Sequence, residues 1–228
     1  EDERTLRCAQ NMLQEGMDTP ILIGRPEVLQ HRLDRLGIEL KAGADFEVVN
    51  PQEDRRYADY WGAYYDLRKR DGVSVDLAKA ILRTNTTVIG ALMVHRGEAE
   101  SVICGLFGEY HWHLRYVSEV LARDGRKPIG AASMLIMDEG PLWIADTHVH
   151  EDPSAEQIVE IARAAARVMR DFSQEPKVAF ISHSDFGSVA AADPSKMRRA
   201  VELLDAAGAD FEYEGEMQVD TAMDLEIL

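Results

Sequence analysis

The stretch PILIGRPEVLQHRLDRLGIELKAGADFEVVN, residues 20–50, decides the fold class. Pro20–Gly24 is a short apolar run that ends in glycine, and Phe46–Asn50 is a second run of this kind. Between them, Pro26–Leu36 has a proline at the position where a helix would begin. Strand, helix and strand in this order are typical of a parallel sheet covered by helices. The sequence therefore predicts an α/β protein with mostly parallel sheets.

The same alternation continues on both sides of this stretch. Thr86–Val94 is apolar all round, which predicts a buried helix, and Ala131–Asp146 reads as an antiparallel hairpin with a turn at Asp138–Gly140. Asp152 or Ser154 would cap the helix that follows. The remaining predicted helices are Leu6–Leu13, Tyr57–Gly72, Val75–Arg83, His113–Leu121, Pro153–Arg170, one that starts at Asp193–Pro194 as N-cap and first residue, and Met217–Leu228; the remaining strands are Ser101–Gly105, Val178–Ser182 and Phe211–Tyr213.

The hairpin interrupts the alternation, so a division between two α/β lobes would fall around residues 125–145. We assign residues 1–140 to the first lobe and residues 141–228 to the second.

The charge balance excludes some partners. Lys and Arg number 25 against 41 Asp and Glu, which gives a net charge of −16 and speaks against a nucleic-acid or anionic membrane surface. The longest apolar runs, such as Val88–Val94, fall far short of the roughly 20 residues of a membrane span. Cys8 and Cys104 lie far apart, so we expect reduced cysteines rather than a disulfide framework or a zinc knuckle. These features predict a cytoplasmic protein.

The segment Ala145–His150 reads as a strand that ends in a His-x-His pair, His148 and His150. Alternate residues of a strand point the same way, so both imidazoles could meet one cation, as in barrel metallohydrolases. Such a barrel needs about 200 further residues, and the alternative is a pair of loop histidines at a strand end. A second pair, His111 and His113, has no carboxylate or cysteine at a familiar spacing. We therefore assign no metal.

A loop of small polar residues follows the predicted strand that ends at Ser182. Serines 182, 184 and 188 together with Gly187 could converge hydroxyl and backbone N–H donors on a phosphate. The alternative is an ordinary polar loop between a strand and a helix. There is no Walker lysine and no G-x-G-x-x-G, so neither a P-loop ATPase nor a dinucleotide fold is indicated.

Two further polar clusters complete the candidate site. Arg115 ends a glycine-spaced loop and is expected on the first turn of a helix, where a guanidinium can hold a phosphate or carboxylate by two parallel hydrogen bonds. Arg83–Thr87 precedes the buried helix, and its alternative is a cap by Thr84 or Asn85 with Arg83 at a solvated end. No catalytic residue can be assigned from spacing. The candidate binding residues are Arg83, Asn85, His113, Arg115, Ser182, Ser184, Gly187 and Ser188.

Six segments, spread in order over the whole chain, carry a family resemblance: Glu1–Arg7, Arg83–Thr87, Cys104–Arg115, Ile144–Val149, Ser182–Ser188, and Asp210–Asp220 with its Gly215-Glu-Met. The ordered set resembles the phosphate acetyltransferase and butyryltransferase family, and more closely its version fused to bacterial NADP-dependent malic enzymes. The resemblance implies two α/β/α lobes around a cleft, a fold similar to isocitrate and isopropylmalate dehydrogenases. It also implies acetyl-CoA (or CoA) and phosphate as ligands, and a homodimer.

The resemblance further implies a chain truncated at both ends, lacking the family's first strand and its C-terminal stretch with the catalytic Ser-Arg and Asp motif. Tyr110–His113 and Tyr116 depart from the transferase pattern, whereas Arg115 is retained. The resemblance thus favours an acetyl-CoA sensor attached to a malic enzyme; the alternative is an active phosphate acyltransferase that makes acetyl phosphate. We expect no cofactor in this domain, whereas NADP and a divalent metal would belong to the parent malic enzyme.

Overall fold

The computed structural model describes residues 2–122, 129–138 and 140–224. The chain forms two compact units, residues 1–122 and 123–228. The second unit thus begins at residue 123, whereas the lobe assignment from the sequence started the second lobe at residue 141. The reason is strand pairing, because the first strand of the hairpin bonds to the second and both belong to one unit. The α/β content is confirmed, while the arrangement of two lobes around a cleft stays a prediction.

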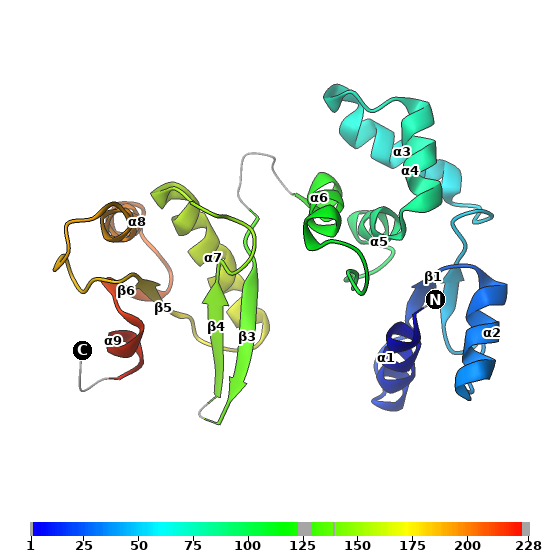
Figure 1. Cartoon of the computed structure of the whole chain (residues 1–228), viewed down its shortest axis with the longest axis horizontal. Helices are drawn as coiled ribbons and strands as arrows, with labels where there is room; N and C mark the ends of the chain where they lie inside the picture. The colour runs from blue at the N-terminus through cyan, green and yellow to red at the C-terminus, as the bar shows by residue number, and fades with distance from the viewer. Residues whose placement is uncertain (1, 123–128, 139, 225–228) are drawn as a thin grey trace. The chain divides into compact units, whose positions relative to one another are not determined.

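After a first helix, α1 (Glu3–Gln14), the first unit contains the predicted strand, helix and strand (Figure 1). Strand β1 (Ile21–Ile23) pairs in parallel with β2 (Glu47–Val49), and α2 (Pro26–Leu36) connects them. Gly37 ends α2 with a φ of 65°, a left-handed conformation that glycine adopts at low cost. The other elements are α3 (Tyr57–Arg68), the short 3₁₀ helix η1 (Lys69–Asp71), α4 (Val75–Thr84), α5 (Thr86–His95) and α6 (Tyr110–Leu121).

Helix α5 forms the centre of the main core of this unit. All residues from Thr87 to Met93 are buried, which confirms the prediction of a helix buried on every side. Helices α3 and α4 pack around it through side chains that include Tyr60, Tyr64 and Leu82. The tyrosine hydroxyls keep polar partners at the edge of the core, since Tyr64 donates to Glu119 at 2.6 Å. Helices α1 and α2 share a separate core cluster with Phe46.

Residues 101–105 form no strand, so that prediction is wrong. The segment runs instead as irregular chain beside α5, where a β-carbon added to Gly90 would lie only 2.6 Å from Val102 Cγ2. This close approach shows that Val102 packs on the helix rather than pairing with a strand. An apolar run bounded by glycine does not distinguish these two outcomes. The structure buries only Val102 of this run in part, whereas Ile103 is 80% exposed.

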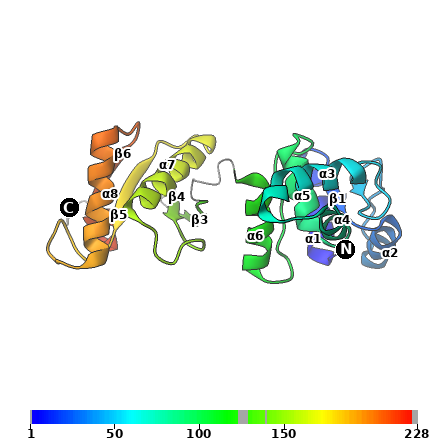
Figure 2. The same ribbon diagram turned by 90° about the horizontal axis from the view of Figure 1, so that it is seen from above.

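The second unit contains the predicted hairpin, β3 (Ala132–Met137) and β4 (Gly140–Ala145), paired antiparallel from Ala132–Ala145 to Met137–Gly140. It is followed by α7 (Ala155–Asp171), β5 (Lys177–Ile181), α8 (Ala192–Ala207), β6 (Glu212–Met217) and α9 (Val219–Met223). Strands β5 and β6 pair in parallel with α8 as their connection. Helix α7 packs against α8 over a core that includes Ala166, Phe180 and Leu204 (Figure 2).

The two long helices of this unit begin differently. Ser154 caps α7 and forms a reciprocal capping box with Gln157, as one of the two predicted caps. Helix α8 begins at Ala192 after Ala191, not at Pro194 after an Asp193 cap, so that prediction is wrong. Proline fits anywhere in a first helical turn, because N–H groups there have no intrahelical acceptor. The predicted C-terminal helix is short, and residues 225–228 lie outside the described residues.

In the part of the chain that the structure describes, no single helix has the length and apolar composition of a membrane span. Helices α4 and α5 meet those criteria only as a pair, bent by 105°.

The packing around α5 can be tested with two leucines of α4. Leu82 is fully buried in the main core, whereas Leu77 on the same helix is 47% exposed. We expect Leu82→Ala to lower the free energy of unfolding by about 2–5 kcal/mol, through lost apolar burial and the cavity left behind. The matched control, Leu77→Ala, should stay within about 0.5 kcal/mol. Urea unfolding measures both, and equal effects would contradict the assigned core.

Candidate functional site

The polar loop Ser182–Ser188 follows strand β5, as the sequence predicts, and it lies against the end of β6. Ser182 N–H donates to the Met217 carbonyl at 2.9 Å, and Phe186 N–H donates to the Glu216 carbonyl at 2.8 Å. The loop therefore sits at the carboxyl ends of two parallel strands, the region where open α/β sheets bind ligands.

A fully buried carboxylate, that of Glu216, holds this loop in place. It accepts hydrogen bonds from Arg198 Nη1 at 2.7 Å to each oxygen, from Ser184 Oγ at 2.8 Å and from Gly187 N–H at 2.9 Å. Burial by itself would raise the pKa of Glu216, but these donors, with the Arg198 charge, lower it below its ordinary value. The carboxylate is thus ionised inside the protein.

The serine hydroxyls of the loop are committed to one another. Ser184 is buried and gives its hydroxyl hydrogen to Glu216, so the 3.2 Å contact between Ser184 and Ser188 is a bond that Ser188 donates. Ser182 donates to the Ser184 carbonyl. The hydroxyl donors expected to bind phosphate are therefore engaged within the loop or with Glu216, and a ligand would have to replace one of those bonds. Gly187 and Ser188 are exposed and remain reachable.

A second anchor fixes the loop to the segment after β6. The Asp185 carboxylate accepts from Gln218 N–H at 2.8 Å, from the Gln218 amide at 2.7 Å and from Thr221 Oγ1 at 2.9 Å. These bonds, led by that of the Gln218 backbone, lower the pKa of Asp185. Between the two anchors, Phe186 and Gly187 adopt left-handed φ values of 45° and 89°. Opposed anchors of this kind can hold an uncommon conformation.

Arg115 lies on the second turn of α6, not on the first turn that the sequence analysis expected, because the helix already begins at Tyr110. Its side chain is 70% exposed, and its Nε donates to Glu119 Oε1 at 2.9 Å. This pair points along the helix toward its C-terminal end, away from the first N–H groups. Arg115 is a reachable cation whose present partner is a carboxylate of its own helix.

His113 has both ring nitrogens engaged. Nε2 lies 2.7 Å from the Phe107 carbonyl, which can only accept, so Nε2 carries the hydrogen and Nδ1 accepts from Thr87 Oγ1 at 2.8 Å. Gly108 has a φ of 91°, and a β-carbon there would come within 3.2 Å of Nε2. His113 therefore shapes the loop before α6 and has no ring nitrogen left for a ligand.

The cluster around Asn85 divides into a buried part and an exposed part. Asn85 caps α5 by accepting from Val88 N–H at 3.2 Å, which confirms the capping alternative, and its buried Nδ2 finds no partner among the described residues. Arg83 is exposed, lies over the Tyr57 ring and donates to the Tyr57 hydroxyl at 3.1 Å. Asn85 and Thr87 are buried, whereas Arg83, Thr84 and Thr86 are exposed and reachable by a ligand.

The histidines after the hairpin are not arranged as a metal site. His150 Nδ1 lies 2.6 Å from Asp146, whose carboxylate also accepts the backbone N–H groups of His148, Val149 and His150. Burial would raise the pKa of Asp146, but the His150 and backbone bonds lower it overall. Within residues 2–122, 129–138 and 140–224, no group of three or more His, Cys, Asp or Glu side chains could hold a metal ion.

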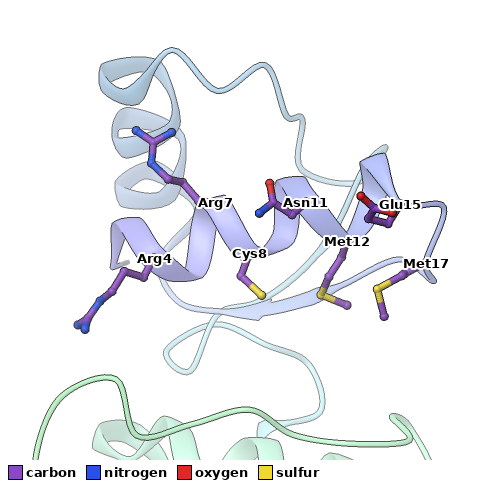
Figure 3. A pocket seen from close by; sticks show the side chains of 7 residues that line it. All are labelled: Arg4, Arg7, Cys8, Asn11, Met12, Glu15 and Met17. Atoms are coloured by element: carbon purple, nitrogen blue, oxygen red, sulfur yellow. The ribbon is translucent and has the colours of Figure 1, made fainter. Parts of the chain in front are cut away.

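A shallow groove runs along one face of α1, where Cys8, Met12 and Met17 point the same way (Figure 3). It is mostly apolar, and none of the candidate binding residues lines it. The candidate site therefore does not lie there.

Sequence reasoning from spacing missed Glu216 and Arg198. An acidic residue in a strand has no local pattern that predicts burial. Its partner, Arg198, lies on α8, a separate element of the chain. One signal was present, because Gly215 inside a strand indicates close backbone approach. A β-carbon on Gly215 would lie 2.8 Å from the Phe180 carbonyl oxygen.

The lowered pKa values of Glu216 and Asp146 predict acid sensitivity. Each carboxylate stabilises the fold above its unfolded pKa, and that contribution is lost as pH falls through the lower folded value, because the unfolded chain then binds more protons. We expect the free energy of unfolding to decrease as pH falls below about 5, and to continue to decrease below the unfolded pKa values of about 4. Glu216→Gln should show a shallower decrease in urea unfolding, and an identical slope would contradict the assignment.

Comparison with known proteins agrees with the ordered motifs. A family model described as phosphate acetyl/butaryl transferase matches residues 1–228. An NADP-dependent malic enzyme of Salmonella typhimurium is 45% identical over 224 residues, which make up 98% of this chain and 30% of that protein. A phosphate acetyltransferase of Nitratidesulfovibrio vulgaris is 27% identical over 227 residues, 99% of this chain and 32% of that protein.

A solved phosphotransacetylase structure from Streptococcus pyogenes has a TM-score of 0.88 and 27% identity, and the match covers 99% of this chain and 68% of that one. The chain spans about 30% of the length of the curated relatives it matches. Since the family model extends over the whole sequence, the chain belongs to the phosphate acetyl/butaryl transferase family.

Proposed function

We propose that this chain is a transferase-like domain that binds acetyl-CoA and phosphate and regulates a malic enzyme. The observation that carries the proposal is the Ser182–Ser188 loop, fixed at the carboxyl ends of β5 and β6 with Gly187 and Ser188 exposed. In α/β proteins this position is a general ligand site. Family membership supplies the ligand class, acetyl-CoA and phosphate.

The regulatory role rests on two further observations. Relatives at 44–47% identity are malic enzymes, whereas the phosphate acetyltransferases in the same comparison are 27–29% identical. In the segment that departs from the transferase pattern, His113 is locked between Thr87 and the Phe107 carbonyl. A side chain committed in this way is not available as an acid or a base in turnover, which is what a sensor without transferase activity would require. The dimer and the cytoplasmic location stay predictions.

The second candidate function is phosphate acyl transfer itself, favoured by the phosphate acetyltransferase that matches 99% of the chain. In that reaction a phosphate oxygen attacks the acyl carbon of acetyl-CoA, the carbon–sulfur bond breaks, and the CoA thiolate leaves and takes up a proton. The Ser182–Ser188 loop would position the phosphate. No residue of the described chain is assigned as a nucleophile.

Calorimetry with acetyl-CoA, combined with a coupled assay for acetyl phosphate, separates the two functions. We expect the chain to bind acetyl-CoA and to form no acetyl phosphate from acetyl-CoA and phosphate. Turnover would favour the transferase. Absence of binding in a folded sample would contradict both.

Arg115 offers a residue-level test of binding. We expect Arg115→Ala to weaken acetyl-CoA binding by roughly 1.5–3 kcal/mol, because a charge-assisted hydrogen bond to the ligand is lost. Arg7 is the matched control, since it forms the same i,i+4 surface ion pair with Glu3 that Arg115 forms with Glu119. Arg7→Ala should leave the dissociation constant unchanged, and equal effects of the two changes would count against the site.

A further inference from the structure

We propose that Glu216, acting with Arg198, is the positioning residue that holds the Ser182–Ser188 loop in its ligand-binding conformation. The inference rests on the proposed function and extends it to a residue pair that touches no ligand. Glu216 is fully buried, so it acts only through the groups bonded to it.

The bonds of Glu216 show what it stabilises. Its carboxylate accepts hydrogen bonds from Ser184 Oγ and Gly187 N–H, and its backbone carbonyl accepts one from Phe186 N–H. Three of its hydrogen bonds therefore come from the loop. Arg198 on α8 supplies the compensating charge. A carboxylate is costly to bury, and an apolar side chain of similar size would fill the same space without that cost. We therefore explain the buried negative charge of Glu216 by the hydrogen bonds that it accepts from the loop.

The loop needs such a support because of its backbone. Phe186 and Gly187 both have left-handed φ values, which are unfavourable for an aromatic residue. Their N–H groups are the two that Glu216 binds, one through its carbonyl and one through its carboxylate. Without an ionised Glu216, Ser184 Oγ and Gly187 N–H lose a charged acceptor. The exposed tip at Gly187 and Ser188, where the ligand would contact the loop, then loses its fixed position.

Arg198 is the second half of the device. Its Nη1 bonds both Glu216 oxygens, and its Nη2 donates to Ser195 Oγ at 2.9 Å, which fixes the guanidinium against α8. A β-carbon on Gly187 would lie 3.9 Å from Arg198 Nη1. The guanidinium of Arg198 thus lies close to the tip of the loop at Gly187. A lysine at position 198 would keep the positive charge but could not bond Glu216 and Ser195 through two nitrogens of one planar group.

The test is Glu216→Gln, which keeps the side chain's size and removes its charge. We expect acetyl-CoA to bind at least tenfold more weakly by calorimetry at neutral pH, with inorganic phosphate as a second probe. Arg198→Ala should behave in the same way, and Arg198→Lys should recover part of the affinity. Arg199→Ala is the control, because Arg199 is the next residue of α8 and its ion pair with Glu202 is exposed.

Amide hydrogen exchange supplies a readout that a general loss of stability would not reproduce. In Glu216→Gln, exchange should accelerate at Phe186 and Gly187 while the α7 amides stay protected. Unchanged affinity in Glu216→Gln, beside normal binding by the unsubstituted chain, would overturn the inference alone. Equal acceleration in the loop and in α7 would reduce Glu216 to a stability role and also overturn it. Failure of the unsubstituted chain to bind would overturn the proposed function and this inference together.

Discussion

The ion pair between the buried Glu216 carboxylate and the partly exposed Arg198 is the interaction on which the candidate site depends. It connects the end of β6, the loop after β5 and the first turns of α8, three segments that strand pairing alone would leave independent. A buried carboxylate is tolerated only where donors surround it, and here the donors belong to the loop. Strand β6, helix α8 and the loop are therefore connected through one side chain. The exposed tip at Gly187 is held in position by Glu216, a buried residue that a ligand does not contact.

In the first unit, apolar packing around α5 holds the candidate residues in place. Helix α5 is buried on every side, and the polar groups at its start are used internally: Asn85 caps the helix and Thr87 bonds His113. The loop before α6 is shaped by His113, and the cations at the surface, Arg83 and Arg115, are held by neighbouring side chains. In both units, bonds from neighbouring residues hold most of the candidate side chains in place, although Asn85 Nδ2 has no partner among the described residues. This arrangement reconciles a net charge of −16 with an anionic ligand, because a small number of fixed local groups decides binding.

Much of the fold followed from local patterns. The parallel β1–α2–β2 unit, the antiparallel hairpin and the buried α5 each have a periodicity or a terminator that acts within a few residues. The errors lie where the local pattern allows more than one structure. Ser101–Gly105 is irregular chain of which Val102 packs on α5, and α8 begins before Pro194. For the candidate site, the position of the loop followed from the sequence. The turn of α6 that carries Arg115, and the hydrogen bonds of both, did not.

The sequence by itself determined the α/β class, the place of the serine loop after β5 and, through motifs in family order, membership of the phosphate acetyl/butaryl transferase family. Only the tertiary structure decided which polar residues are free. Ser184 and His113 form hydrogen bonds inside the protein, and Arg115 donates to Glu119. Glu216 is bonded to a loop that begins 34 residues before it in the chain. The physical reason is that periodicity encodes which side chains are buried. The partner of a buried polar group is set by contacts between distant segments, which spacing along the chain does not record.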